Sequence, residues 1–339
     1  MVTKVLVTGG AGFIGSNFVR YALQQHADWH VTNLDKLTYA GRRENLHDVM
    51  DNPRHTFVHG DILDASTAGP LVEAADYVVH FAAETHVDRS ILAAGDFIKT
   101  DVEGSFVLLE AARRNPKLKR FVQISTDEVY GSVSEGSSRE TDELRPRNPY
   151  SASKAGADRL AYSYWATYDV PVVITRASNN YGPNQFPEKV IPLFITNALD
   201  SLPLPLYGDG LNERDWIHVS DHCHAIDVVI ASGRNGEVYN VGGGNPVANA
   251  DLTRRILRLL DRPESLIRHV ADRQGHDRRY SLDTTKLETL GWQPRVAFEQ
   301  GLADTVRWYQ QNESWWRPIK HQDAQFKEYY QAQYGSRQG

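Results

Sequence analysis

Short apolar runs alternate with longer stretches of helical spacing through the first half of the chain. The apolar runs are nearly continuous and rich in Val and Ile, which is typical of strands buried on both faces of a sheet. The predicted strands are 4–9, 30–35, 55–61, 77–83, 120–126 and 171–178.

Helices are predicted between these strands, where apolar residues recur every three or four positions. The predicted helices in this half are 16–26, 104–115 and 150–168. Regular alternation of strand and helix favours an α/β protein with a doubly wound parallel (Rossmann) sheet. We therefore expect a first domain over residues 1–180.

After about residue 180 prolines and glycines interrupt the pattern, as in "NNYGPNQFPEKVIPLF" and "LPLPLYGDG". Helices are predicted at 250–262 and 298–312. We expect a smaller C-terminal substrate-binding domain over residues 181–330, with some of its segments returning to the first domain.

The composition is that of an ordinary globular protein, with 41% hydrophobic and 24% charged residues in a chain of 339. A net charge of -6 provides no general attraction for nucleic acid or an anionic membrane. Cys223 is the only cysteine, no apolar run is long enough to span a bilayer, and the first residues do not resemble a signal peptide. We expect a cytoplasmic protein that binds neither nucleic acid nor membranes.

A glycine-rich turn follows the first predicted strand and opens a helix. "TGGAGFIGS" places Gly10, Gly12 and Gly15 in the spacing G-x-G-x-x-G, and Gly9 adds an overlapping match. Such a turn lets a pyrophosphate approach the unpaired N–H groups of the helix N-terminus. Asp35 ends the next strand, where an acid binds the adenine ribose and repels a 2′-phosphate. This combination predicts an NAD site.

Further cofactor contacts are expected at the carboxyl ends of the next two strands, because that edge of a doubly wound sheet is the ligand crevice. Asp61 is a candidate adenine contact, and Ala82 and Ala83 leave room for the cofactor. Alternatively, Asp61 is the N-cap of a helix.

Tyr150 and Lys154 are four residues apart at the start of a predicted helix, just after Pro149. Positions i and i+4 share one helix face, so we expect the ammonium to lower the pKa of the phenol. The tyrosine can then take a proton from a substrate hydroxyl while hydride leaves the same carbon.

Two adjacent acids, Asp127 and Glu128, follow Thr126 at the end of a predicted strand. Alcohol oxidation alone needs no acids there, whereas elimination of water needs a base for a C–H proton and an acid for the departing hydroxyl. The pair is therefore interpreted as base plus acid, with environment separating their pKa values. The alternatives are a solvated turn or a helix N-cap at Asp127.

The tyrosine–lysine pair, the upstream threonine and the glycine turn together resemble the extended short-chain dehydrogenase/reductase family. The acid pair and the motifs around it are similar to the dTDP-glucose 4,6-dehydratases, a branch of that family. The similar segments are "TGGAGFIGSNF", "NLDKLTYAG", "FAAETHVDRSI", "STDEVYG", "PYSASKAGAD", "SNNYGPNQFPEKVIPLF", "YGDGLNERDW", "YNVGGGN" and "GHDRRYSLD".

The resemblance implies an NAD-dependent lyase that forms a 4-keto-6-deoxy sugar nucleotide in deoxysugar biosynthesis. Tyr150 would take the 4-hydroxyl proton, Glu128 would remove and later return the C5 proton, and Asp127 would protonate the leaving 6-hydroxyl, with NAD regenerated each turn. The family also implies a homodimer that pairs the Tyr–Lys helix with its neighbour.

Binding residues are assigned from the motifs and the resemblance together. The expected catalytic residues are Thr126, Asp127, Glu128, Tyr150 and Lys154. The expected cofactor-binding residues are Gly9, Gly12, Phe13, Ile14, Gly15, Asp35, Lys36, Thr38, Asp61, Ile62, Phe81, Ala82, Ala83, Thr100, Tyr150, Lys154 and Asn180. The expected substrate-binding residues are Thr85, Thr126, Asp127, Glu128, Asn179, Lys189, Val190, Pro205, Leu206, Tyr207, Arg214, Asn249, Arg273, His276 and Tyr280.

Three positions depart from the family pattern: Thr85 replaces a serine, Gln274 replaces a proline, and Glu213 stands beside Arg214 where an aliphatic residue is common. Glu213 either competes with a diphosphate for that arginine or points outward.

Other features leave alternatives open. The basic run "DRQGHDRR" is interpreted either as ligand contacts or as a solvated face or salt-bridge partners, and Arg278 and Arg279 are each interpreted as structural or as ligand-binding. "DHCH" at 221–224 does not predict a metal site, because adjacent helical residues do not share a face. The aromatic C-terminal stretch covers the core or a subunit surface, with core packing the default.

Two other functions compete with this interpretation. One is an enzyme acting on another nucleotide sugar, either a UDP- or GDP-sugar dehydratase or a 4-epimerase. An epimerase has no use for the acid pair. The other is a non-catalytic NAD-sensing protein, which would not need the acids, the tyrosine and the lysine together.

Overall fold

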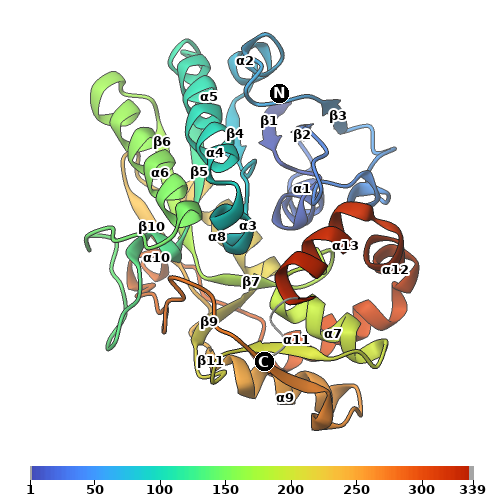
Figure 1. Ribbon diagram of the computed structural model, residues 1–339. Helices are drawn as coiled ribbons and strands as arrows, with labels where there is room; N and C mark the ends of the chain where they lie inside the picture. The colour runs from blue at the N-terminus through green and yellow to red at the C-terminus, as the bar shows by residue number, and fades with distance from the viewer. Residues whose placement is uncertain (1, 336–339) are drawn as a thin grey trace.

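Seven parallel strands form the central sheet of the computed structural model, which describes residues 2–335 (Figure 1). Their order across the sheet is β10-β6-β5-β4-β1-β2-β3. The chain thus leaves β1 for β2 and β3 on one side and for β4 on the other, and this reversal is where doubly wound sheets bind ligands. The strands are β1 (Thr3–Thr8), β2 (Trp29–Asp35), β3 (His55–His59), β4 (Tyr77–His80), β5 (Arg120–Thr126), β6 (Val172–Ala177) and β10 (Val238–Val241).

Helices cover both faces of this sheet, which explains the continuous apolar runs. In β1, Leu6 packs on one face, and Val5 and Val7 pack on the other, because successive strand side chains point to opposite sides. The first face is covered by α2 (Ala65–Glu73), α5 (Gly104–Arg113) and α6 (Pro149–Tyr168). The second is covered by α1 (Phe13–Gln25) and α8 (Val219–Ser232).

Helix α6 begins where the sequence predicts. Asn148 is its N-cap: the side chain accepts a bond from the backbone N–H of Ser151 at 2.9 Å, and the Ser151 hydroxyl accepts one from the Asn148 N–H. Pro149 occupies the first helical position, where no backbone donor is needed. Asp169 ends the helix in a left-handed conformation with φ 56°. These local capping interactions place Tyr150 and Lys154 in the first turns of α6.

Short helical segments lie in the connections that leave the carboxyl ends of the strands. After β4 the chain forms three consecutive segments before α5, and a single turn follows β5. These segments and one near the N-terminus are η1 (Arg43–Leu46), α3 (Val87–Leu92), α4 (Ala94–Phe97), the π-helical η2 (Ile98–Glu103) and η3 (Asp127–Tyr130).

The C-terminal half forms a second body of helices and short strands beside the carboxyl ends of the sheet (Figure 1). Its strands are β7 (Asn179–Tyr181), β9 (Glu213–His218) and β11 (Pro246–Ala248) in one small sheet, and β8 (Leu204–Tyr207) and β12 (Ile267–Val270) in another. Its other elements are α7 (Val190–Leu199), α9 (Asn249–Leu259), η4 (Glu264–Leu266), α10 (Thr285–Glu288), α11 (Phe298–Gln311), α12 (Glu313–Gln322), α13 (Ala324–Tyr330) and η5 (Gln331–Gly335).

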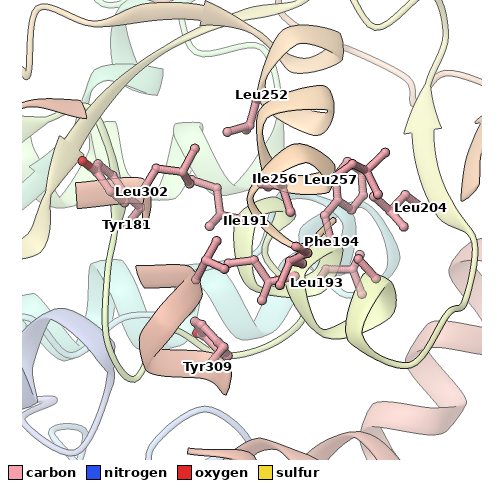
Figure 2. Packing of buried hydrophobic residues seen from close by; sticks show 14 of the residues in the cluster. Tyr181, Ile191, Leu193, Phe194, Leu204, Leu252, Ile256, Leu257, Leu302 and Tyr309 are labelled. Carbon is pink, nitrogen blue, oxygen red and sulfur yellow. The ribbon is translucent and has the colours of Figure 1, made fainter. Parts of the chain in front are cut away.

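A separate apolar core holds this half together (Figure 2). Phe194 of α7, Ile256 of α9 and Tyr309 of α11 all lie in it and are at most 2% exposed. Helix α7 was not predicted, because prolines interrupt its sequence; Pro192 is tolerated in the first turn, where a backbone donor has no helical partner. Within residues 2–335 no helix is long and apolar enough to cross a bilayer.

Candidate active site

Two adjoining clefts lie at the carboxyl ends of the central strands. The first cleft is bordered by the glycine-rich turn and the ends of β1 to β6. The second cleft lies between the loop after β4 and the C-terminal half. Glu128, Asn179, Glu188 and Lys189 line both clefts. A ligand reaching from one cleft into the other therefore passes Glu128.

The glycine-rich turn accepts no side chain at two of its positions. Gly9 has φ +73°, and a Cβ there would lie 2.6 Å from the backbone nitrogen of Ala82. A Cβ on Gly15 would lie 2.3 Å from the carbonyl oxygen of Gly9. The turn therefore packs directly on the backbone that follows β4, and the N-terminus of α1 opens at the cleft after Gly12. An anion in the first cleft would meet backbone N–H groups rather than side chains.

Asp35 braces this turn from the end of β2. It is 7% exposed, and its two oxygens accept hydrogen bonds of 2.8 Å from the backbone N–H groups of Ala11 and Leu37. Burial raises the pKa of the Asp35 carboxyl, and those two bonds oppose the rise. Each oxygen keeps acceptor capacity toward the cleft, because a carboxylate has about four lone-pair sites. The first cleft thus fits an adenine ribose and a pyrophosphate.

All residues expected to bind the cofactor line the first cleft. One of the two interpretations of Asp61 is wrong: the N-cap of α2 is Asp64, whose side chain accepts from Ser66. Asp61 instead accepts a bond from the N–H of Leu63 and pairs with Lys36 at 2.7 Å, on the wall of the cleft.

Thr126 and Asp127 are held at the end of β5. Thr126 caps the short helix η3 by accepting a bond from the N–H of Glu128, so the cap is not Asp127. Asp127 is 3% exposed. Its Oδ1 accepts from the Thr126 hydroxyl at 3.1 Å, and its Oδ2 has no partner among the described residues. Burial, and then the Glu128 carboxylate, raise the pKa of Asp127 well above its usual value. A protonated Asp127 suits the donation of a proton.

Glu128 has a different environment although it is the next residue. It is only partly buried, and it opens on both clefts. Its carboxylate accepts long hydrogen bonds from Asn148 at 3.4 Å and from the Tyr280 hydroxyl at 3.5 Å. The two acids therefore differ in burial and in their partners, which is the arrangement that separates an acid from a base.

Tyr150 and Lys154 both line the first cleft. The Lys154 ammonium donates to the carbonyl oxygen of Ile124 at 2.7 Å, and burial lowers the pKa of Lys154. The pKa of Tyr150 is raised well above its usual value by burial first and then by Glu128 and Asp101, while a hydrogen bond with Thr126 opposes the rise.

This result differs from the expectation that Lys154 lowers the pKa of the phenol. The ammonium is held by a backbone carbonyl, and the nearby charges that act on Tyr150 are carboxylates. Only the phenolate of Tyr150 can accept a proton, so Tyr150 must lose its own proton before it takes one from a substrate hydroxyl.

Asp101 lies beneath these residues and was not predicted. It is 1% exposed, and its oxygens accept from the Ser153 hydroxyl at 2.6 Å and from the N–H of Glu84 at 2.8 Å. Burial raises the pKa of Asp101 to about 6, against the influence of Lys154. The residue ties the π-helical segment η2 to the first turns of α6.

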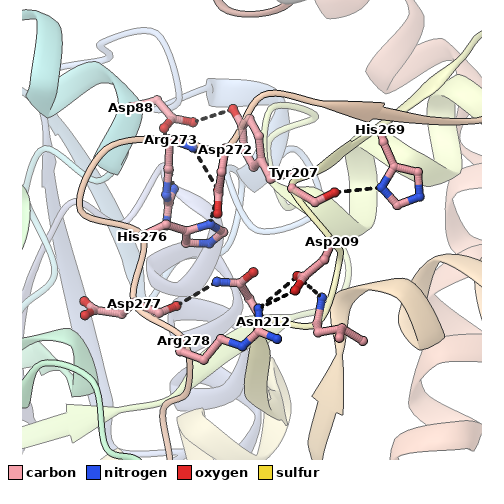
Figure 3. Close-up of polar contacts among 12 residues, drawn as sticks. Asp88, Tyr207, Asp209, Asn212, His269, Asp272, Arg273, His276, Asp277 and Arg278 are labelled. Atoms are coloured by element: carbon pink, nitrogen blue, oxygen red, sulfur yellow. Dashed lines mark hydrogen bonds and ion pairs between the residues drawn. The ribbon is translucent and has the colours of Figure 1, made fainter. Parts of the chain in front are cut away.

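The second cleft carries three cationic side chains. Arg214 is 5% exposed and donates to the carbonyl oxygen of Asp277 at 2.9 Å. Arg273 lies 3.5 Å from Asp88 (Figure 3). Lys189 donates to the carbonyl oxygen of Thr85, and burial lowers its pKa. Three convergent cations suit a diphosphate.

Several buried polar atoms of the second cleft have no hydrogen-bond partner among the described residues. These atoms include Arg273 Nε, Asp88 Oδ1, Asn179 Oδ1 and Asn249 Oδ1, and each belongs to a residue that lines the cleft. Buried polar groups normally find partners. A polar ligand that carries both donors and acceptors would satisfy them.

Nearly all residues expected to bind substrate line one of the two clefts, and Tyr280 does not. Tyr280 is 2% exposed and lies one layer behind, where its ring faces the Arg214 guanidinium at 4.4 Å and its hydroxyl reaches Glu128. It therefore contacts two residues that line the clefts. The side chains missing from the expectation include Asp88, which lies in the quoted segment "FAAETHVDRSI", and Tyr334, for which the sequence carries no signal.

The basic run and Glu213 also have definite positions. Arg278 pairs with Asp209 on the surface at 2.9 Å (Figure 3), and Arg279 pairs with Glu213 at 3.4 Å. The Glu213 carboxylate is thus directed to Arg279. The hydrogen bond between Arg214 and Glu213 is made by the backbone oxygen of Glu213 and not by its carboxylate. Glu213 does not compete with a diphosphate for Arg214.

In the segment "DHCH", one histidine reaches the first cleft. His222 is buried, its Nδ1 lies 2.9 Å from the amide oxygen of Asn180, and burial lowers its pKa to about 3. In the described part of the chain no group of three or more His, Cys, Asp or Glu side chains lies close enough to hold a metal ion. His222 orients Asn180.

Comparison with known proteins agrees with this geometry. Residues 6–305 match the family model of GDP-mannose 4,6 dehydratase. The chain is 52% identical over 325 residues to a dTDP-glucose 4,6-dehydratase of Streptomyces niveus, covering 94% of this chain and 96% of that one. It is 54% identical over 305 residues to the low-salt glycan biosynthesis protein Agl12 of Haloferax volcanii, covering 90% and 98%.

Among solved structures, DesIV of Streptomyces venezuelae is a dTDP-glucose 4,6-dehydratase determined with NAD bound. It superposes with a TM-score of 0.92 at 53% identity, covering 94% of this chain and all of that one. The fold and site thus define an extended short-chain dehydrogenase/reductase. The chain belongs to the family of sugar-nucleotide 4,6-dehydratases.

Proposed function

We propose that the protein is an NAD-dependent lyase that converts dTDP-glucose to dTDP-4-keto-6-deoxyglucose. The observation that carries this proposal is the acid pair at the junction of the clefts. Asp127 and Glu128 lie beside Thr126 and Tyr150, and both acids face the first cleft. Oxidation alone requires the threonine, tyrosine and lysine, whereas loss of water also requires the acids.

Each residue then has a defined task. Tyr150, aided by Thr126 and Lys154, takes the proton of the sugar 4-hydroxyl. NAD held by the glycine-rich turn and Asp35 in the first cleft would supply an acceptor for the C4 hydride and a donor of that hydride to C6. Glu128 removes the C5 proton, which the 4-keto group has made acidic, and Asp127 protonates the departing 6-hydroxyl as water. Glu128 finally returns a proton to C5. Tyr150 releases its proton to solvent and Asp127 takes one up, so one water is lost and no net redox change occurs.

The relatives support the choice of substrate, since those of Streptomyces are dTDP-glucose 4,6-dehydratases at about half identity over nearly the full chain. An epimerase is disfavoured because it would leave both acids without a task. The cytoplasmic location, the boundary near residue 180 and the individual residue roles remain predictions.

The experiment incubates the purified protein with dTDP-, UDP- and GDP-hexoses and follows loss of water by mass spectrometry. The proposal expects turnover with dTDP-glucose and without added NAD, because the cofactor is regenerated in each cycle. Accumulation of reduced cofactor with an unchanged 6-hydroxyl would show a net dehydrogenase instead. Dehydration of a UDP- or GDP-hexose alone would reassign the substrate.

A homodimer is also proposed. Exposed aromatic side chains lie on the neighbouring helices α5 and α6, where Phe106, Tyr162 and Tyr168 are 46%, 38% and 48% exposed. Aromatic side chains are enriched at interfaces. Light scattering at micromolar concentration should give twice the mass of the chain, and a monomer would refute the proposal.

A further inference from the structure

The C-terminal segment Ala324–Gly335, which comprises α13 and η5, forms part of the second cleft. Tyr334 lines the cleft together with Pro205, Leu206 and Tyr207 of β8. More than a hundred positions separate these residues in the sequence. The segment therefore does more than cover the core.

Aromatic contacts fix this segment from two sides. The Tyr329 ring lies 5.3 Å from the His86 ring in an edge-to-face arrangement, and the Arg89 guanidinium faces the same ring at 4.4 Å. The next residue, Tyr330, accepts a hydrogen bond from Asn197 of α7 at 3.2 Å. Such anchors hold the following turn, η5, at the cleft.

Within η5, two consecutive residues contact Tyr207. Gln333 is 4% exposed, and its amide donates to the Tyr207 hydroxyl at 2.5 Å. The Tyr207 hydroxyl donates in turn to Asp88 at 3.3 Å. The rings of Tyr207 and Tyr334 are 6.1 Å apart with 30° between their planes. Two tyrosine rings thus stand side by side on the cleft wall.

The order of groups in a nucleotide sugar indicates which part meets this wall. The hexose must lie at Glu128, which lines both clefts, and the diphosphate suits the cations Arg214 and Arg273. The nucleobase is the group farthest from the reacting hexose, and Tyr334 lines the second cleft but not the first. Flat aromatic side chains are the surfaces on which bases stack.

We infer that Tyr334 contacts the nucleobase of the substrate beside Tyr207, and that Gln333 is a positioning residue that holds Tyr207. This inference rests on the proposed function, because it assumes a nucleoside diphosphate in the second cleft. It makes the C-terminal segment part of the substrate site.

Calorimetry on the NAD-loaded protein tests the inference, with dTDP, UDP, GDP and inorganic pyrophosphate as ligands. Pyrophosphate reports on the cations alone. Tyr334→Leu should weaken dTDP binding by roughly tenfold to a hundredfold, the scale of one lost stacking contact, and leave pyrophosphate binding within about twofold. Tyr334→Phe keeps the ring and should bind dTDP nearly as the wild type does.

Two further variants keep the test decisive even where Tyr334→Leu folds poorly. Gln333→Leu removes the bond to Tyr207 and should weaken dTDP binding by roughly threefold to tenfold, again without an effect on pyrophosphate. Gln331→Leu is the matched control for Gln333→Leu, because it makes the same change at an exposed position of the same turn. Its dTDP-to-pyrophosphate ratio should not change.

Unchanged dTDP binding in both Tyr334→Leu and Gln333→Leu would overturn the inference. Equal weakening of dTDP and pyrophosphate would overturn it too, because the effect would then be a general distortion of the cleft. A wild-type protein that binds none of the nucleoside diphosphates would refute the proposed function and the inference with it. That outcome is recognised from the wild type alone.

Discussion

The two clefts meet at Glu128, yet the chain builds their walls in different ways. The first cleft is lined by residues that follow consecutive strands of one sheet, from the glycine turn after β1 to Asn179 after β6. The second cleft collects single residues from distant segments, such as Asp88, Arg214, Arg273 and Tyr334. A parallel sheet brings all its strand ends to one edge, so the first cleft follows from the topology.

The difference also separates chemistry from recognition. The groups that move protons, Asp127, Glu128 and Tyr150, line the first cleft at the end of β5 and the start of α6. Groups that suit the nucleotide lie in the second cleft, around three cations. Variants in the first cleft should therefore change kcat, and variants in the second should change KM.

The largest effect is expected for Tyr150→Phe, which removes the group that takes the first proton. Oxidation at C4 should slow by roughly a hundredfold to ten-thousandfold, the scale of a positioned base, with KM little changed. Single-turnover kinetics with dTDP-glucose measure the step. Tyr164→Phe is the control, because that hydroxyl lies on the same helix but bonds Glu110. An active Tyr150→Phe variant would contradict the assignment.

Asp127→Asn should slow elimination by roughly a hundredfold or more while oxidation survives. The variant keeps the shape and loses the proton donor, so under single turnover a 4-keto-hexose with its 6-hydroxyl should accumulate. Glu128→Gln should in addition block exchange of the C5 proton with deuterium from solvent. Mass spectrometry separates these outcomes, and near-normal dehydration by both variants would mean that the pair is structural.

In the second cleft, Arg273→Met should raise KM for dTDP-glucose by roughly tenfold to a hundredfold, the scale of a lost charged hydrogen bond, with kcat within a few-fold. The variant keeps the aliphatic stem and removes the charge. Arg278→Met is the control, since its partner Asp209 is on the surface, and it should stay within about twofold. A fall in kcat at constant KM would break the proposed division between the clefts.

The smallest effect is expected for Asp101, whose ionisation should change the free energy of unfolding with pH. The folded-state pKa of Asp101 is raised from 3.8 to about 6, so the unfolded chain releases this proton first as pH rises. Asp101 therefore destabilises the fold progressively between about pH 4 and pH 6, by roughly 3 kcal/mol at most.

Urea unfolding at several pH values should show that wild-type stability relative to Asp101→Asn falls over this window. The exposed Asp251→Asn variant should show no such change. A difference that rises with pH would contradict the sign of the shift.

Short-range motifs made much of the first cleft predictable. Each motif spans only a few consecutive residues, namely Gly10, Gly12 and Gly15 in one and Tyr150 and Lys154 in the other. The ends of the parallel strands then bring both motifs to one edge of the sheet. The start of α6 was predictable for the same reason, because Asn148 and Pro149 act within one turn.

The electrostatics of the same residues were not predictable. Lys154 is four residues from Tyr150, which suggested a lowered pKa for the phenol. Burial and the carboxylates of Glu128 and Asp101, the latter contributed by η2, raise it instead. Desolvation depends on everything packed around a group, and no local spacing reports it.

Sequence alone determined the fold class, the glycine turn and the five residues proposed for catalysis, because periodicity and short motifs act between near neighbours. Tertiary structure decided that Thr126 rather than Asp127 caps η3, that Tyr280 lies behind the cleft wall, and that Glu213 is directed to Arg279. It also brought Tyr334 to Tyr207. Such contacts join residues far apart in the chain, and packing of the whole core selects them.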